Sequence, residues 1–315
     1  MRIVVTCIQL LRDIDQWRPA LEEAGFDVVL PDIPGQHLEG DDLVAALEGC
    51  AGVVAGDDKF TAEVLDQLPD LRVISKWGIG VDGIDRHHAA QKGIAVTNTP
   101  GAFDDEVADV AFAYMVMLLR QLHVVNEGVR GGGWPKPAGH SLAGQRLGVI
   151  GLGGIGRAVV RRGRVAGMDV VGADPLPESQ AAAIADGATV VELDELLRTS
   201  SIVSVNCPLT PETHHLLNHD RLALMPPGSY VVNTGRGDVI DTAALATALR
   251  SGHLAGAALD VLEQEPPGPE NPIRGIDSVI LGSHNGSNTL EASARVHRRS
   301  IENLARELGR EIRLP

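Results

Sequence analysis

The stretch Arg146-Leu-Gly-Val-Ile-Gly-Leu-Gly-Gly-Ile-Gly156 decides the fold, because an apolar strand runs directly into a glycine-rich turn. The next segment, Arg157 to Gly167, has the composition of a helix, and a second apolar strand, Asp169-Val-Val-Gly-Ala173, ends on Asp174. A strand, a Gly-x-Gly-x-x-Gly turn, a helix and a second strand ending in an acid form the dinucleotide-binding fingerprint. The sequence therefore predicts a Rossmann-type dinucleotide site here.

Each glycine of this turn has a separate expected role. The first makes the tight turn, the second lets the backbone approach a pyrophosphate at the helix N-terminus, and the third allows close packing of helix on strand. Asp174 is placed to accept hydrogen bonds from the ribose hydroxyls, and the following Pro175 to Ser179 contains no base for a 2′-phosphate, which favours NAD over NADP. The cofactor residues expected in this segment are Gly151, Gly153, Gly154, Ile155, Gly156 and Asp174.

A second match to the glycine spacing, Gly78-Ile-Gly-Val-Asp-Gly83, also follows an apolar strand, Leu71 to Trp77. The next strand, Ile94 to Asn98, ends in an amide instead of an acid. A cofactor turn needs strand, turn, helix and acid together. We therefore expect a different use for this second turn.

Composition limits the class of protein. At 315 residues the chain is long enough for two domains, and 44% hydrophobic with 22% charged residues is ordinary for a soluble protein. The formal net charge of -15 disfavours nucleic acid or an anionic membrane as partners. Cys7, Cys50 and Cys207 lack metal-binding spacing, so we expect no metal site and a cytoplasmic protein.

Strands and helices alternate along the chain, which predicts α/β domains with parallel sheets. The pattern is interrupted at Thr99-Pro-Gly101, after which one long helix is expected from Asp104 to about Val129, and it resumes at Arg146. The fold expected is two Rossmann-like, doubly wound parallel-sheet domains, with the NAD domain inserted in a flavodoxin-like substrate domain. The expected borders are residues 1–99 plus 285–315 for the substrate domain and 100–284 for the NAD domain.

Three strand ends carry candidate catalytic side chains. Arg236 follows the apolar strand that begins at Tyr230, Asp260 ends the strand that begins at Ala257 and precedes Glu263 and Glu265, and His284 follows the strand that begins at Ser278. The carboxyl ends of parallel strands form the ligand-binding edge of an open α/β sheet. These side chains are therefore expected near the cofactor.

The chain resembles the D-isomer-specific 2-hydroxyacid dehydrogenases over essentially its whole length. The resemblance rests on Gly78-x-Gly-Val-Asp82, Asn98-Thr-Pro-Gly101, Gly151-Leu-Gly-Gly-Ile-Gly156, Pro208-Leu-Thr-Pro-Glu-Thr213, Asn233-Thr-Gly-Arg-Gly-x-Val-x-Asp241, Asp260-Val-x-x-x-Glu-Pro266 and Ser283-His284. These motifs occur in the family's order. The resemblance implies an NAD-dependent oxidoreductase that transfers hydride between a nicotinamide and a D-2-hydroxy acid or 2-oxo acid.

The resemblance also implies roles for particular residues. Arg236 would bind the substrate carboxylate, His284 would act as general acid and base, and Glu265 would orient His284 and stabilise its protonated form. Backbone N–H groups in the turn of Gly78, Ile79 and Gly80 would hold the substrate carboxylate. Further cofactor contacts are expected from Cys207, Pro208, Thr213, Thr234, Gly235, Asp260 and Gly286. By the same resemblance the protein would be a homodimer through the cofactor domains and the long helix.

The substrate is left open between a small 2-oxo acid such as glyoxylate or hydroxypyruvate and a 3-phosphoglycerate-like acid. Phosphoglycerate dehydrogenases carry an Arg-Ser pair in the loop after the third strand, where this chain has Val54-Ala-Gly-Asp-Asp-Lys59. Two acids there would repel phosphate and leave Lys59, Lys76 and Lys136 as its only partners. An alternative is an NADH-responsive, corepressor-like binding protein with little turnover.

The remaining histidines are expected to be structural. Both adjacent pairs, His87-His88 and His214-His215, are predicted to lie on helices with their side chains pointing apart.

Overall fold

The computed structural model describes residues 1–315. The chain divides into two compact units, Met1–Phe103 with Thr289–Pro315, and Asp104–Asn288. The borders expected from sequence lie after residues 99 and 284. Each unit is a parallel α/β sheet with its own core, and the fold class predicted from sequence is confirmed.

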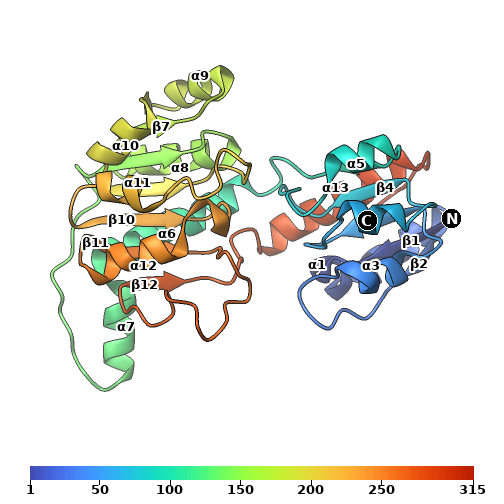
Figure 1. Ribbon diagram of the computed structural model, residues 1–315, viewed down its shortest axis with the longest axis horizontal. Helices are drawn as coiled ribbons and strands as arrows, with labels where there is room; N and C mark the ends of the chain where they lie inside the picture. Colours follow the sequence, from blue (N-terminus) through green and yellow to red (C-terminus); the bar gives the residue numbers. More distant parts are fainter. The chain divides into compact units, whose positions relative to one another are not determined.

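The first unit is built on a five-stranded parallel sheet with the order β2-β1-β3-β4-β5, which is the flavodoxin-like order (Figure 1). Its strands are β1 (Arg2–Val5), β2 (Asp27–Val29), β3 (Gly52–Ala55), β4 (Val73–Lys76) and β5 (Ala95–Thr97). Its helices are α1 (Ile8–Arg12), α2 (Ile14–Glu23), α3 (Gly40–Leu47), α4 (Ala62–Asp66), α5 (Arg86–Gln91) and, from the end of the chain, α13 (Leu290–Glu307).

The last helix belongs to the core of this first unit. One face of α13 buries Val296, Ile301 and Leu304. The Ser75 hydroxyl on β4 donates to the Ser300 carbonyl at 2.7 Å, so helix and sheet are joined by a buried hydrogen bond as well as by apolar contact. Burying an aliphatic side chain of this size stabilises a fold by about 1.5–3 kcal/mol.

The second unit is built on a seven-stranded parallel sheet with the order β12-β11-β10-β9-β6-β7-β8. Its strands are β6 (Arg146–Ile150), β7 (Asp169–Ala173), β8 (Thr189–Val190), β9 (Ile202–Val205), β10 (Ser229–Asn233), β11 (Leu254–Leu259) and β12 (Val279–Leu281). Its helices are α6 (Asp104–Arg120), α7 (Leu122–Arg130), α8 (Gly154–Val165), α9 (Pro177–Ala185), α10 (Leu193–Thr199), α11 (His219–Leu224), α12 (Thr242–Arg250) and the short η1 (Gly237–Val239).

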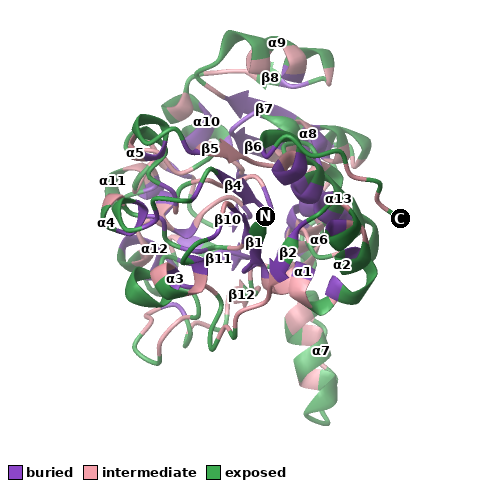
Figure 2. Cartoon of the chain, turned by 90° about the vertical axis from the view of Figure 1, so that its right-hand side faces the viewer, coloured by how far each residue is buried: buried purple, intermediate pink, exposed green.

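The dinucleotide fingerprint occupies the middle of this second sheet. β6 lies between β7 and β9, and the chain reverses its direction of winding there. In open α/β sheets ligands bind at the carboxyl edge beside such a switch point. β6 and β7 are buried along all but their first residue, and Figure 2 shows both strands in purple.

The single helix expected from Asp104 to about Val129 is wrong, because the structure breaks it into α6 and α7 at Gln121. Gln121 takes the left-handed conformation with φ 50°, and the two helices meet at a bend of 68°. The returning chain supplies the cause. The His140 N–H donates to the Leu119 carbonyl at 2.8 Å, and the Gln121 amide donates to Ala138 at 3.0 Å, so tertiary bonds replace part of the helical ladder.

α7 projects from the second unit and has no buried residue (Figures 1 and 2). Leu122, Val124 and Val129 are exposed along it, and Trp134 is exposed in the loop that follows. No helix taken alone has the length and apolar composition needed to cross a membrane, and only the bent pair α6 and α7 meets both criteria, when counted together.

Candidate active site

The glycine turn after β6 has the geometry that the fingerprint requires. Gly151 has φ 85°, and a Cβ built there would lie 2.6 Å from the Cys207 backbone nitrogen. A Cβ on Gly156 would collide with the Gly151 carbonyl, so α8 packs tightly against the turn. Gly153 is the N-cap residue of α8, and a Cβ added there would meet no atom within 4 Å. The turn is closed where it must pack and open where a phosphate would approach.

Asp174 lies at the carboxyl end of β7, directly beside this turn. One carboxylate oxygen accepts the Leu152 N–H at 2.7 Å, and the other accepts the Leu176 N–H at 2.9 Å. The two backbone bonds fix the carboxylate while its remaining lone pairs stay available, because a carboxylate can accept about four hydrogen bonds. The predicted acid is therefore held where a ribose could meet it.

The strands β9 and β10 bring further predicted cofactor residues to the same edge. A Cβ on Gly235 would lie 2.9 Å from the Cys207 carbonyl, which places the ends of β9 and β10 side by side. The Thr213 hydroxyl donates to the Pro208 carbonyl at 2.7 Å, and Thr234 donates to Asn206 at 3.3 Å. Burial raises the pKa of the Cys207 thiol to about 11, so this residue stays protonated and packs as an apolar side chain.

Asp260 at the end of β11 organises the loop after β12. Its carboxylate accepts the N–H groups of Gly286 at 2.8 Å and Asn285 at 3.2 Å, and its own carbonyl accepts the His284 N–H at 2.7 Å. Tyr114 on α6 donates its hydroxyl to Asp260 at 3.4 Å. Burial and the Asp260 charge raise the pKa of Tyr114 to about 12, so the phenol remains a donor. Asp260 thus fixes the backbone on which His284 stands.

His284 and Glu265 form a hydrogen-bonded pair. The His284 Nδ1 lies 2.8 Å from one Glu265 oxygen, and the other Glu265 oxygen accepts the Leu262 N–H at 2.8 Å. Both side chains are about one-third exposed, at 37% and 36%. The bond occupies Nδ1 and directs Nε2 away from Glu265, which is the arrangement of a histidine oriented for proton transfer.

Arg236 stands on the adjoining strand end. Its Nη1 donates to the Gly235 carbonyl at 2.9 Å, and the Asn233 amide donates to the Arg236 carbonyl at 2.9 Å. A Cβ on Gly237 would collide with the Leu262 backbone, so the loops that carry Arg236 and Glu265 pack directly on each other. The second unit therefore brings all three predicted catalytic residues to one sheet edge.

The second glycine turn lies in the first unit, after β4. Gly78 has φ 118°, its N–H donates to the Thr99 hydroxyl at 3.2 Å, and its carbonyl accepts the Thr99 N–H at 2.9 Å. The Asn98 amide donates to the Ile79 carbonyl at 2.7 Å. These bonds use the Ile79 carbonyl. They do not use the N–H groups of Ile79 and Gly80, which are the groups expected to face an anion.

Sequence reasoning missed several residues that shape these sites. Tyr114 supports Asp260, and Asn98 fixes the turn after β4. Glu263, noted from sequence only as a nearby acid, pairs with the His215 Nε2 at 2.7 Å. The motif Asn98-Thr-Pro-Gly101 was a usable signal for Asn98, whereas the other contacts join distant segments.

The expectation that His214 and His215 point apart on a helix is wrong. His215 has φ 48° in a turn, and the two rings stack with their centroids 4.1 Å apart. Because His215 has this left-handed conformation, its side chain does not take the direction that a helix would give it. His87 and His88 do lie on α5, where they bond to Gln91 and Asp66 respectively.

The geometry defines a Rossmann-type dinucleotide-binding unit with a hydrogen-bonded His-Glu pair at the carboxyl edge of its sheet. An open approach at Gly153 and a fixed Asp174 both fit a dinucleotide. Residues 112–286 match the model of the D-isomer specific 2-hydroxyacid dehydrogenase, NAD binding domain. The chain belongs to this family and is an NAD-dependent oxidoreductase.

Relatives of this chain support the same placement. It is 40% identical to the glyoxylate reductase of Thermofilum pendens over 78% of this chain and 75% of that protein. It is 37% identical to the hydroxypyruvate reductase of Thermotoga maritima over 88% of this chain and 91% of that protein. The crystal structure of D-lactate dehydrogenase from Aquifex aeolicus with NAD and lactic acid superposes with a TM-score of 0.87, at 27% identity over 98% and 96% of the two chains.

Proposed function

We propose that the protein interconverts a small D-2-hydroxy acid and its 2-oxo acid, with Arg236, Glu265 and His284 as its catalytic residues. The observation that carries the proposal is the His284–Glu265 hydrogen bond at the same sheet edge as the dinucleotide turn. That pair supplies a proton donor and acceptor beside the place where a hydride carrier would lie. The names of the two curated relatives favour glyoxylate or hydroxypyruvate as substrate.

A nicotinamide held by the glycine turn and Asp174 would supply the hydride needed to reduce the carbonyl carbon of a 2-oxo acid. His284 donates the Nε2 proton to the carbonyl oxygen, so the product is the 2-hydroxy acid. Glu265 keeps the ring oriented during the transfer and offsets the positive charge of the imidazolium. In the reverse direction the neutral His284 accepts the hydroxyl proton.

Arg236 provides the fixed positive charge in this scheme. A guanidinium can bind the substrate carboxylate through two parallel hydrogen bonds, which fixes both the position and the rotation of the acid. Its backbone is already held by Asn233 and its Nη1 by the Gly235 carbonyl. In the first unit, the Ile79 and Gly80 N–H groups are the groups we propose for binding a substrate carboxylate.

We also propose a homodimer. The unburied helix α7 exposes Leu122, Val124 and Val129, an apolar surface of the kind that a partner subunit covers. Light scattering on purified protein should give twice the mass of the chain. A monomer at micromolar concentration would contradict this part of the proposal.

The experiment that tests the function is NADH oxidation against a panel of 2-oxo acids: glyoxylate, hydroxypyruvate, pyruvate, longer and aromatic oxo acids, and 3-phosphohydroxypyruvate. Turnover of at least one at ordinary enzyme rates, about 1–10³ per second, is the expected result. NADH binding without turnover of any panel member would reject the proposal and favour the corepressor-like binding protein.

A further inference from the structure

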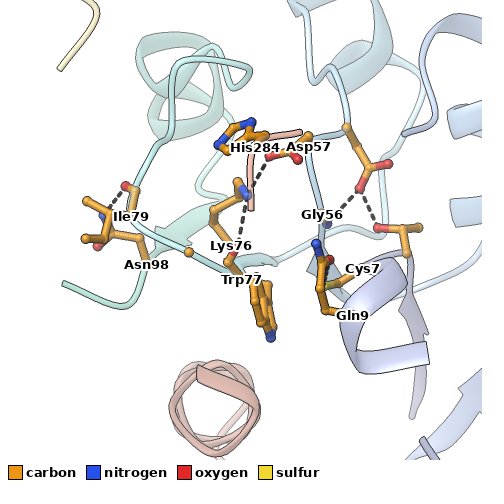
Figure 3. A network of polar contacts seen from close by, with 12 residues as sticks. Cys7, Gln9, Gly56, Asp57, Lys76, Trp77, Ile79, Asn98 and His284 are labelled. Atoms are coloured by element: carbon orange, nitrogen blue, oxygen red, sulfur yellow. Dashed lines mark hydrogen bonds and ion pairs between the residues drawn. The ribbon is translucent and has the colours of Figure 1, made fainter. Parts of the chain in front are cut away.

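A buried lysine lies beneath the turn after β4. Lys76 is the last residue of β4, and its side chain is 10% exposed. Its ammonium donates to the Trp77 carbonyl at 2.8 Å and to the Asp57 carboxylate at 3.0 Å (Figure 3). A lysine is seldom buried without a partner, because removing its charge from water is costly. The Asp57 carboxylate therefore balances the charge of the buried Lys76 ammonium.

The position of this ammonium relates it to the substrate. A Cβ built on Gly78 would lie 3.5 Å from the Lys76 Nζ. Gly78 begins the turn whose Ile79 and Gly80 N–H groups we propose to bind the substrate carboxylate. The ammonium is thus next to the proposed anion site, within the same unit and at the same end of the sheet.

The two acids of the loop after β3 have different tasks. Asp58 is 2% exposed and accepts the N–H groups of Leu38 at 2.8 Å and Gly56 at 3.0 Å, together with the Thr6 hydroxyl. It fixes the loop from inside. Asp57 is 57% exposed and directs its carboxylate to Lys76. We expected both acids of this loop to repel a phosphate. Because Asp58 is buried and held by these bonds, only Asp57 can do so.

We propose that Asp57 is a specificity-determining residue that restricts the site to 2-oxo acids with a single anionic group. This inference rests on the proposed function. Asp57 already satisfies the Lys76 charge, so a second anion on the substrate would face a carboxylate instead of an available cation. A binding site can exclude an unwanted ligand by placing a charge of the same sign against it, as the Asp57 carboxylate would against a substrate phosphate. Without the Asp57 charge, Lys76 would take a substrate phosphate by a charge-assisted bond.

Two substrates that differ only in a phosphate test this. For each variant, kcat/KM is measured with hydroxypyruvate and with 3-phosphohydroxypyruvate. Asp57→Asn keeps the shape and a hydrogen-bond acceptor but removes the charge. It should raise the ratio of the phosphorylated to the plain substrate by about tenfold, mainly through a lower KM for the phosphorylated one. Asp57→Ala should change the ratio in the same direction.

Two controls locate the effect. Asp70→Asn removes an exposed acid of the same unit outside the loop and should leave the ratio at the wild-type value. Asp57→Asn combined with Lys76→Met removes both charges and should return the ratio to near that value. An unchanged ratio in Asp57→Asn, or the same increase in the double variant, would overturn the proposal.

A binding measurement separates this inference from the proposed function. Calorimetric titration with inorganic phosphate needs no turnover, so it remains informative if no 2-oxo acid in the panel reacts. Asp57→Asn should bind phosphate at least about tenfold more tightly than the wild type, and the double variant should not. Equal phosphate affinity in wild type and Asp57→Asn would refute the role of Asp57 even in an active dehydrogenase.

Discussion

The turn after β4 and the turn after β6 share the Gly-x-Gly spacing, and both lie at the carboxyl end of a parallel strand. Gly78 and Gly151 both have positive φ, at 118° and 85°. In each case the residue at the end of the next strand bonds to the middle residue of the turn. The donor and acceptor roles, however, are reversed.

After β4, the Asn98 amide donates to the Ile79 carbonyl at 2.7 Å. After β6, the Asp174 carboxylate accepts the Leu152 N–H at 2.7 Å. The Asn98 side-chain amide thus holds the turn by donating to a backbone carbonyl of the turn, and this neutral group brings no negative charge near a bound anion. A carboxylate holds the turn through an N–H group and presents an acceptor to ribose hydroxyls. The glycines decide that the chain bends, and the next strand's side chain decides which ligand suits the bend.

The largest effect should come from His284→Gln, which tests whether proton transfer lies on the second sheet. Loss of a positioned acid-base group should lower kcat by about 10²–10⁴. NADH affinity, measured by fluorescence titration, should stay near the wild-type value. His140→Gln, at an exposed histidine of the same unit, serves as the control. A parallel loss of NADH binding would move His284 from catalysis to cofactor binding.

Arg236→Lys should have the next largest effect. Lysine keeps the charge but cannot form the two parallel bonds of a guanidinium, so transition-state binding should weaken by about 1.5–3 kcal/mol. Steady-state kinetics should show a lower kcat together with a higher KM for the 2-oxo acid. Wild-type kinetics would remove Arg236 from the substrate site.

Alanine at the first glycine of each turn tests the comparison directly. Both positions have a conformation that costs a residue with a Cβ about 1–3 kcal/mol. Gly151→Ala, where the Cβ also meets Cys207, should weaken NADH binding. Gly78→Ala should raise the KM for the 2-oxo acid with little change in NADH affinity. If both variants lose the same ligand, the two turns do not have separate uses.

Asp174→Ala should have a smaller effect, on the choice between NADH and NADPH. Loss of the carboxylate removes an acceptor for the ribose hydroxyls and the bond to Leu152. The preference for NADH over NADPH, expressed as the ratio of kcat/KM values, should fall by about tenfold. Asn98→Ala should leave that ratio unchanged. An unaltered preference in Asp174→Ala would exclude this acid from ribose recognition.

The smallest effect concerns the support of the turn after β4. The Trp77 indole N–H donates to the His297 Nδ1 at 2.8 Å, and the opposite Nε2 lies 3.1 Å from Asp13. An indole N–H only donates, so Nδ1 must be unprotonated. Burial lowers the pKa of His297 from its ordinary 6.5, against the opposing influence of Asp13. The folded state therefore favours the neutral ring.

The sign of the pH dependence follows from that lowered pKa. Above about pH 6.5 the His297 ring is neutral in both the folded and the unfolded state, so its titration takes nothing from the free energy of unfolding. As the pH falls below this value the unfolded state binds the proton first, so stability declines until the folded pKa is passed. Thermal melts at pH 7.5 and 5.5 should show a smaller pH dependence in His297→Asn than in wild type. The exposed His219→Asn should behave like wild type, and an unchanged slope in His297→Asn would contradict the assignment.

Several outcomes were accessible from sequence because the information is local. The fingerprint and Asp174 lie within one strand-helix-strand segment, so their spacing alone predicts that they meet. The strand-end positions of Arg236 and His284 follow from the same alternation. Helix continuity was less predictable: the break at Gln121 depends on His140, which reaches the Leu119 carbonyl from the returning chain.

The sequence by itself determined the parallel α/β class, the dinucleotide turn and the strand-end positions of the residues proposed for catalysis, since these follow from short-range patterns. The tertiary structure decided which of two neighbouring acids is buried and which one pairs with Lys76. It also decided that Trp77 meets His297 across 220 positions of the chain. Such contacts depend on how strands order themselves and how the last helix returns to the first sheet. The physical reason is that packing many distant side chains at once selects these partners, and no local spacing encodes them.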